Sequence, residues 1–177
     1  MADESNKRAA PLLTATERLS ERRRVDAQLV LPFEMRSRSR LRARLSTGEE
    51  IGVLLPRGQV LRGGDLLHAS DGRVIEVAAA AEAVSTVHGL DATALARAAY
   101  HLGNRHVALQ VGDGWLRFLH DHVLDDMVRG LGLQVRCEQA PFEPEFGAYS
   151  SATGSAFHLH RHPHPHAHPA AHDHSHE

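Results

Sequence analysis

Short runs of alternating hydrophobic and polar residues fill the first half of the chain, and this period of two is typical of β-strands. Turns such as Thr47-Gly48 and Asp71-Gly72 separate the runs at close spacing. The predicted strands cover residues 25–31, 40–45, 51–55, 65–68 and 74–77. Together they predict a small antiparallel β domain, built as a sandwich or a barrel.

A different rhythm follows the alanine-rich stretch at residues 78–81. The predicted elements, in chain order, are strand 82–87, a helix capped by Asp91, strands 107–111 and 115–119, a helix capped by Asp121, and an alternating strand from Leu133 to Cys137. Two βαβ halves in this order predict a ferredoxin-like βαββαβ domain. The fold class is therefore α+β, and we expect Cys137 to be a small core residue.

Each predicted helix carries one apolar stripe, which should be buried. We expect the first helix to stop at Gly103. The stripes consist of Leu95, Ala98, Ala99 and Leu102 in the first helix and of Val123, Leu124, Met127, Val128 and Leu131 in the second.

The domain boundary is placed near residue 78. The predicted division is a flexible N-terminal extension at 1–20, a β-rich domain at 21–78, an α+β domain at 79–145 and a flexible histidine-rich tail at 146–177. Residues 15–24 could instead form a short helix at the start of the fold. No apolar run has the length of a signal-peptide core or of a membrane span, so we expect a cytoplasmic protein.

Histidine dominates the end of the chain, where nine of the fifteen histidines lie, nearly all at every second position. Neutral imidazole is a ligand for Zn, Cu, Fe and Ni, and the prolines among these histidines oppose a helix. A tag remnant or a merely solvated tail is the alternative. Because Pro, Ala, Leu, Arg and Asp interrupt the run, we favour metal binding by His158, His160, His162, His164, His166, His168, His172, His174 and His176.

Composition narrows the chemistry further. A net charge of -2 and a low aromatic content give little support to nucleic-acid binding. Arginine recurs at every second position from Arg36 to Arg44, which would place these side chains on one strand face, either solvated or as a docking patch for an acidic protein. The single cysteine excludes an intramolecular disulfide and a cysteine-cluster zinc site, so imidazole should lead any metal binding.

Four further histidines of the predicted α+β domain are candidate ligands, at His101, His106, His120 and His122. His106 stands where a loop meets a strand, a favoured place for a binding residue, although a loop histidine without a role fits equally well. His101 lies on the first helix and is either an ordinary exposed histidine or a neighbour of His106.

His120 and His122 bracket Asp121 at the junction of a strand and a helix. In an extended chain the two imidazoles would share a face and could hold one metal ion. In a helical chain they would not face each other. Asp121 could serve only as the helix cap, or it could also orient an imidazole. The isolated His68 and His88 receive no role.

Several stretches closely resemble the urease accessory nickel chaperones, the UreE family. They are residues 100–110 with the Gly-Asn-Arg-His motif, 120–127 with the His-Asp-His motif, and 141–145. The arginine-rich residues 38–44 and Leu-Pro-Arg-Gly at 55–58 fit the first domain of the same family. With the tail, the resemblance covers about residues 25–177.

This resemblance implies a peptide-binding-like β domain, a ferredoxin-like metal-binding domain, and a homodimer formed through the second domain. In the family the Gly-Asn-Arg-His histidine, here His106, lies at the dimer interface, where two-fold symmetry pairs it with its copy. The His-Asp-His histidines, here His120 and His122, are peripheral ligands in some members, and tail histidines complete or feed the central site. A metal-linked tetramer stays open.

The implied function is that of a nickel metallochaperone, not an enzyme, with Ni(II) as cargo for the urease accessory GTPase and the urease activation complex. Neither nucleic acid nor membrane is an expected partner. Histidines do not select nickel by themselves, because Cu(II) ranks above it and Zn(II) competes for the same donors. A storage or buffering protein that uses only the tail is the alternative. A hydrolytic metalloenzyme is disfavoured because the sequence has no HExxH motif.

Overall fold

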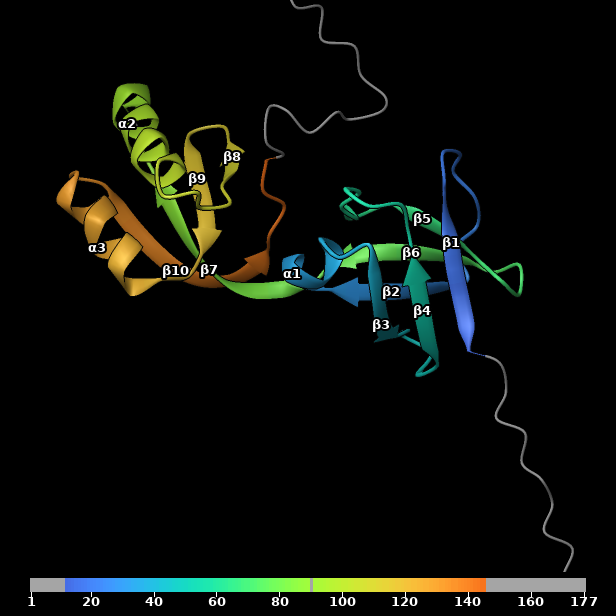
Figure 1. The fold of residues 1–177 in the computed structure, drawn as a ribbon. Coiled ribbons are helices and arrows are strands. Elements are labelled where there is room, and N and C mark those ends of the chain that lie inside the picture. Colours follow the sequence, from blue (N-terminus) through green and yellow to red (C-terminus); the bar gives the residue numbers. More distant parts are fainter. Residues whose placement is uncertain (1–11, 90, 146–177) are drawn as a thin grey trace, which may run out of the picture. The chain divides into compact units, whose positions relative to one another are not determined.

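The computed structural model describes residues 12–89 and 91–145. The first part is a six-stranded sheet in the order β2-β6-β5-β1-β4-β3 (Figure 1). Its elements are β1 (Leu13–Leu19), β2 (Ala27–Leu31), α1 (Phe33–Arg36), β3 (Arg40–Arg44), β4 (Glu50–Leu54), β5 (Leu66–Ala69) and β6 (Val74–Ala79). The five strands from β2 to β6 confirm the five predicted ones, with slightly shifted ends. The edges of the sheet are β2 and β3.

Strand pairing in this sheet is mixed, so the prediction of an antiparallel domain was wrong in that respect. β1 runs parallel to β4, and β2 runs parallel to β6. The remaining pairs, β3–β4, β1–β5 and β5–β6, are antiparallel. Alternation along a strand reports which face is buried, but it says nothing about the direction of the neighbouring strand.

Strand β1 (Leu13–Leu19) lies where the sequence predicted a flexible extension at residues 1–20 or a short helix at residues 15–24. Both interpretations were wrong where they overlap this strand. The strand lies inside the sheet, between β4 and β5. Ala15 is its only buried residue, so the signal of period two is weak there. Pairing with two distant strands decides the conformation, which local preference cannot report.

Alternate residues of the strands form the core of the first domain. The fully buried side chains Leu29, Ile51, Val53, Leu67, Ile75 and Val77 belong to one cluster. Each such burial stabilises the fold by about 1.5–3 kcal/mol relative to an exposed side chain. On β6 the polar Glu76 between Ile75 and Val77 is only partly buried, whereas on β4 Gly52 between Ile51 and Val53 is buried as well.

The second part is a four-stranded sheet in the order β10-β7-β9-β8, with antiparallel neighbours throughout. Its elements are β7 (Ala81–His88), α2 (Ala92–Gly103), β8 (Gln110–Gly112), β9 (Trp115–Leu119), α3 (His122–Gly130) and β10 (Gln134–Pro141). The predicted βαββαβ order is confirmed. β8 is shorter than predicted, since residues 107–109 do not pair with β9 and Leu109 O instead accepts from Glu145 N at 2.8 Å.

Both helices of the second part share one core with its sheet. Ala98 and Leu102 of α2 pack in a cluster with Phe118 of β9 and Val128 of α3, and all four are fully buried. Val123 departs from the predicted stripe, because its side chain is 62% exposed. Among the described residues, no helix is long and apolar enough to cross a membrane.

Aspartate caps begin both long helices, as predicted. Asp91 accepts a hydrogen bond from Thr93 N at 2.9 Å. Asp121 accepts from Val123 N at 2.8 Å and from Leu124 N at 3.3 Å. These caps satisfy backbone donors that the first turn of a helix leaves without partners.

Arg36 is buried, although the arginine pattern predicted it on a solvated strand face. It ends α1, and its guanidinium donates to Leu31 O and Leu61 O at 3.1 Å each. It also contacts the segment that follows β10, through Phe142 O and through Glu143 Oε1 at 3.0 Å. The exposed arginines of the pattern begin only after α1, and three of them lie on β3, at Arg40, Arg42 and Arg44.

Candidate metal-binding sites

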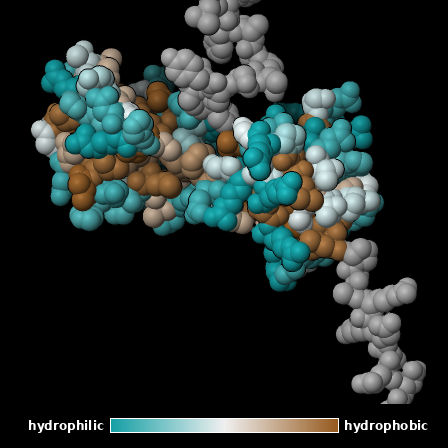
Figure 2. All heavy atoms as spheres, viewed as in Figure 1, coloured by the Kyte–Doolittle hydropathy of each residue, from teal (hydrophilic) through white to brown (hydrophobic). Residues whose placement is uncertain are grey.

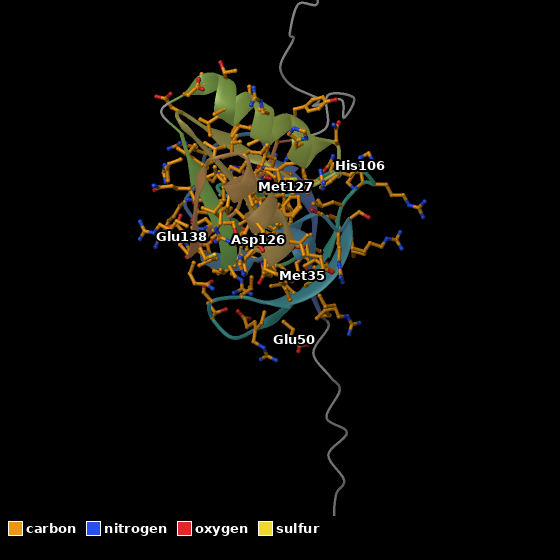
Figure 3. All side chains as sticks on the ribbon, turned by 90° about the vertical axis from the view of Figure 1, so that its left-hand side faces the viewer. Met35, Glu50, His106, Asp126, Met127 and Glu138 are labelled. Atoms are coloured by element: carbon orange, nitrogen blue, oxygen red, sulfur yellow. The ribbon has the colours of Figure 1, made fainter. Side chains whose placement is uncertain are left out.

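The loop after α2 holds His106 in an unusual backbone conformation (Figure 3). The helix ends at Gly103, and Asn104 N donates to Tyr100 O at 3.0 Å. His106 N then donates to Gly103 O at 2.9 Å. The φ of His106 is 57°, the only positive φ at a non-glycine residue in the described part of the chain.

A left-handed backbone costs an L residue roughly 1–2 kcal/mol, which is why glycine usually takes such positions. The sequence places an exposed histidine there instead. Strained residues of this kind cluster at functional sites, so the conformation points to a role for the imidazole of His106. The left-handed turn comes three residues after Gly103, the glycine expected to stop the helix.

His101 lies in the last turn of the same helix and is partly buried. Its ring packs edge-on against Tyr100, with 5.4 Å between the ring centroids. Arg105 Nη1 donates to the carbonyl oxygen of His101 at 3.2 Å. The aromatic contact orients this imidazole, while Tyr100 itself is 65% exposed.

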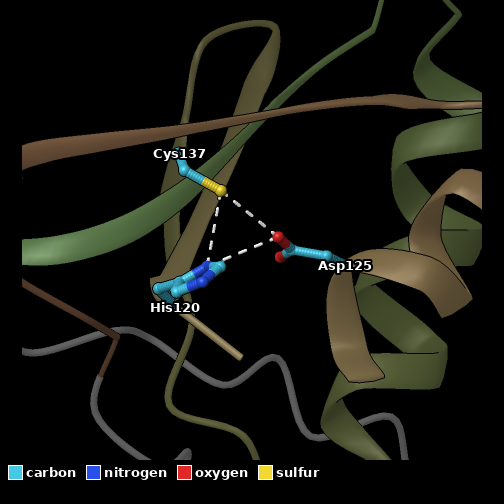
Figure 4. Close-up of side chains that lie close together, drawn as sticks. All are labelled: His120, Asp125 and Cys137. Carbon is cyan, nitrogen blue, oxygen red and sulfur yellow. Dashed lines mark hydrogen bonds and ion pairs between the residues drawn. The ribbon is translucent and has the colours of Figure 1, made fainter. Parts of the chain in front are cut away.

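His120, Asp125 and Cys137 form a compact group of possible metal ligands, and one ligand atom from each lies within 4.8 Å of the others (Figure 4). His120 Nδ1 lies 3.4 Å from Cys137 Sγ and 3.4 Å from Asp125 Oδ2. Cys137 Sγ lies 3.3 Å from the same Asp125 oxygen. Nitrogen, oxygen and sulfur donors thus converge on one point.

Local structure explains how these three side chains meet. His120 follows β9, and its N–H donates to Ala83 O of β7 at 3.0 Å, which fixes its backbone. The cap at Asp121 starts α3 directly afterwards and places Asp125 in the first turn. β10 pairs Cys137 with Ser85 of β7, and Ser85 Oγ lies 3.0 Å from His120 Nδ1.

Asp125 is buried, with its side chain 2% exposed. Its Oδ1 has no hydrogen-bond partner among the described residues. The nearest cation is Arg129 on the next turn of α3, at 3.6 Å from Oδ2, and that guanidinium lies closer to Asp126, at 2.9 Å. A buried carboxylate oxygen without a partner is costly, so this group is suited to bind a cation.

A pocket of about 280 Å³ opens beside His120 and Cys137. Glu138 also lines it, but this carboxylate binds Thr86 Oγ1 at 2.6 Å and Arg117 Nη2 at 3.2 Å. The hydrogen bond from Thr86 and the charges of Arg117 and Arg136 lower the pKa of Glu138 against a smaller opposing effect of burial. Glu138 is therefore already paired with Arg117, and we do not count it among the metal ligands of the pocket.

Family models match both parts of the chain. The model described as UreE urease accessory protein, N-terminal domain, matches residues 10–80, and the corresponding C-terminal domain model matches residues 82–176. The chain belongs to the UreE urease accessory protein family. A family member from Alkalilimnicola ehrlichii, named urease accessory protein UreE, is 65% identical over 138 residues, which cover 78% of this chain and 85% of that protein.

Further UreE proteins show the same relationship. One from Pseudomonas putida strain W619 is 55% identical over 145 residues, covering 81% of this chain and 90% of its own length. The one from Vibrio parahaemolyticus is 55% identical over 130 residues, covering 73% and 82%. The similarity to UreE proteins therefore extends over most of the chain.

The predicted ligands of this UreE-family chain are distributed unevenly. His120 belongs to the three-residue group, whereas His122 is the exposed first residue of α3 and is not part of that group. The metal-binding role of His122 stays a prediction, as do those of His101 and His106. The tail histidines from His158 to His176 lie outside the described residues.

Sequence reasoning missed two members of the group. Cys137 was predicted to be a core residue, but it is exposed. It lies two residues along β10 from the partly buried Val135, on the same face of the strand, and its Sγ contacts Asp125 of α3 at 3.3 Å. Asp125 carried no signal beyond its place four residues after the cap Asp121, which puts it one turn into the helix.

Proposed function

We propose that this protein is a nickel metallochaperone, which binds Ni(II) through histidines and delivers it for assembly of the urease metallocentre. Membership of the UreE urease accessory protein family in both domains is the observation that carries the proposal. The exposed His106 supports the proposal, because its left-handed backbone is a strained conformation of the kind found at functional sites. His101, His120, His122 and the tail histidines are the further proposed nickel ligands.

A homodimer formed through the second domain is part of the proposal. Figure 2 shows apolar surface over the region where Figure 1 places α2, α3 and β10. Tyr100 and Val123, which are 65% and 62% exposed, contribute large apolar side chains on these helices. Exposed apolar patches mark interaction surfaces, and a two-fold axis would turn one His106 into a pair of ligands.

Delivery to the urease accessory GTPase and the urease activation complex, in the cytoplasm, completes the proposed role, which involves no catalysis. Several imidazoles of similar strength allow ligands to be exchanged one at a time. A closed tetrahedral cage would instead retain the metal, as structural zinc sites do. Zn(II) and Cu(II) compete for imidazole, so selectivity for nickel would come from geometry and supply.

We also assign the second domain to the ferredoxin-like plan and the first to the peptide-binding-like β domains of the family. Support for the former comes from the strand order, in which β9 lies between β7 and β8, and β7 lies between β9 and β10. Each βαβ unit is thus split by a strand of the other unit.

Calorimetric titration with Ni(II), combined with mass measurement, tests the proposal on the intact chain, a truncation ending at Phe157, and that truncation carrying His106→Ala. We expect one tight ion per dimer in the truncation and its loss on substitution. The matched control is His88→Ala, which removes an exposed histidine at the end of β7 and should change nothing.

A storage or buffering protein is the rival function. It would bind nickel through the tail alone, so the truncation would lose nearly all tight binding and His106→Ala would have little effect in the intact chain. That result would replace the chaperone proposal with storage.

A further inference from the structure

We infer that His120, Asp125 and Cys137 form a binding site for a zinc-type divalent ion, separate from the site at His106. The sequence pattern paired His120 with His122, whereas the structure gives His120 a thiol and a carboxylate as neighbours. This inference goes beyond the proposed function. It gives His120, which is also a proposed nickel ligand, a thiol and a carboxylate as partners, and neither His106 nor the tail supplies a ligand.

The spacing of the three ligand atoms matches a tetrahedral zinc ion. Zn–S bonds of about 2.3 Å and Zn–N or Zn–O bonds of about 2.0–2.1 Å, at tetrahedral angles, separate the ligand atoms by roughly 3.3–3.6 Å. The corresponding distances among His120 Nδ1, Cys137 Sγ and Asp125 Oδ2 are 3.4, 3.3 and 3.4 Å. An ion could therefore enter after the thiol loses its proton, with only small movements of the side chains.

Burial of Asp125 is an independent indication of a cation. Its carboxyl group is 2% exposed, and Oδ1 has no partner among the described residues. Oδ2 faces the nitrogen and sulfur atoms of the other two ligands. Arg129 is half exposed and holds Asp126 more closely, so it leaves room for a second positive charge at this carboxylate.

The donor set favours zinc over nickel. Thiolate is a soft ligand, and tetrahedral sites that combine sulfur with nitrogen are typical of zinc, whereas Ni(II) prefers square-planar or octahedral arrangements. Three protein ligands leave a fourth position, and the pocket of about 280 Å³ beside His120 and Cys137 provides the space for it. Such an open site binds an exchangeable ion rather than a structural one.

Cobalt(II) is the probe, because it adopts zinc geometry and gives a thiolate-to-metal charge-transfer band. Cys137 is the only cysteine in the chain, so any such band in the intact protein reports this site even while tail histidines bind cobalt as well. We expect the band to appear on titration of the reduced, intact chain with Co(II) under anaerobic conditions. Stoichiometric Zn(II) should then abolish it.

Variants separate the three ligands from their surroundings. His120→Gln and Asp125→Asn should each lower the affinity for the cobalt ion that gives this band by more than about tenfold, whereas the neighbouring Asp126→Asn should leave that affinity unchanged. His120 is 40% exposed, so its variant tests the site even if Asp125→Asn disturbs the fold. Circular dichroism of the metal-free variants verifies folding.

Alkylation provides a second readout. Zn(II) should slow the reaction of Cys137 with iodoacetamide by about tenfold or more in the intact chain, and it should not do so in the His120→Gln variant. A chain without a thiolate band, or a band that survives both His120→Gln and Asp125→Asn, would overturn the inference. If the His106→Ala variant loses nickel binding but keeps the cobalt band, the site at His120, Asp125 and Cys137 is supported as separate from the site at His106.

Discussion

Arg36 and Glu143 are 107 positions apart, yet the guanidinium of Arg36 donates to Glu143 Oε1 at 3.0 Å from a fully buried side chain. The same carboxylate accepts from Gly63 N at 2.8 Å and from Arg62 Nη1 at 3.0 Å. The residues after β10 are thereby fixed to the loops of the first sheet. Ionic and hydrogen-bonding contacts make this connection, together with the edge-on packing of the buried Phe142 against Phe33.

Replacing Arg36 by Met should strongly destabilise the protein. The change removes the donors to Leu31 O, Leu61 O and Phe142 O, and it leaves Glu143 without one of its cations. Because these acceptors are buried or partly buried, we expect a loss of about 3 kcal/mol in the free energy of unfolding. Urea denaturation measures it.

Arg38→Met is the matched control for that experiment. Arg38 is 54% exposed and forms a surface ion pair with Glu34 on the adjacent turn. Its replacement should change the free energy of unfolding by no more than about 0.5 kcal/mol. Equal effects of the two substitutions would contradict the structural role given to Arg36.

The acid dependence of stability should follow Glu143. Partial burial acts to raise its pKa, but the hydrogen bond from Gly63 and the neighbouring Arg62 and Arg36 together lower it below its ordinary value. Because the folded pKa is the lower one, the carboxylate stabilises the fold above its ordinary pKa, and this contribution disappears as the pH falls through the lowered folded value. Glu143→Gln should therefore reduce the loss of stability between about pH 5 and pH 3.

Denaturation curves at successive pH values, recorded for the wild type and for Glu143→Gln, make that comparison. Glu50→Gln is a suitable control, because Glu50 is an exposed carboxylate paired with Arg44 on the sheet surface. Parallel pH profiles for the wild type and Glu143→Gln would show that Glu143 is not the responsible group.

His106→Gly and His106→Ala should both remove nickel binding at the central site but differ in stability. Alanine keeps the cost of a φ near 57°, whereas glycine does not. After allowance for the greater freedom of glycine in the unfolded chain, we expect the glycine variant to be the more stable by about 1 kcal/mol. Thermal unfolding of the two metal-free variants distinguishes backbone strain from ligand loss, and equal midpoints would rule the strain out.

Asp121→Ala should lower the stability of α3 and weaken Zn(II) binding by His120, Asp125 and Cys137. Loss of its hydrogen bonds to Val123 N and Leu124 N should cost about 1 kcal/mol. Since Asp125 sits in the turn that this cap begins, protection of Cys137 by Zn(II) should weaken as well. Asp126→Ala removes a 74% exposed carboxylate from the same turn and should leave protection intact.

Local signals in the sequence were sufficient for much of the second domain. Asp91 and Asp121 cap helices because an aspartate before an apolar stripe satisfies backbone donors, whatever the rest of the fold does. In the first domain, the positions of strands β2 to β6 likewise followed from the alternation of residues and the turns. Their directions and neighbours did not, because pairing partners come from distant parts of the chain.

The candidate sites show the same division between local and distant information. The motif around His106 could be recognised in the sequence, but its left-handed backbone could not. Asp125 and Cys137 meet His120 only because β10 returns beside β7 and α3 begins at that edge. Arg36 fits the period of two of the arginines on β3. It nevertheless lies at the end of α1, before that strand begins.

The arginines on β3 have a consequence for how the protein behaves when concentrated. β3 is an edge of the six-stranded sheet, so its outer backbone groups offer a template for a strand from another molecule. A second copy docking there through the same strand would bring Arg40, Arg42 and Arg44 against identical charges. Mutual repulsion would thus oppose edge-to-edge aggregation through this strand.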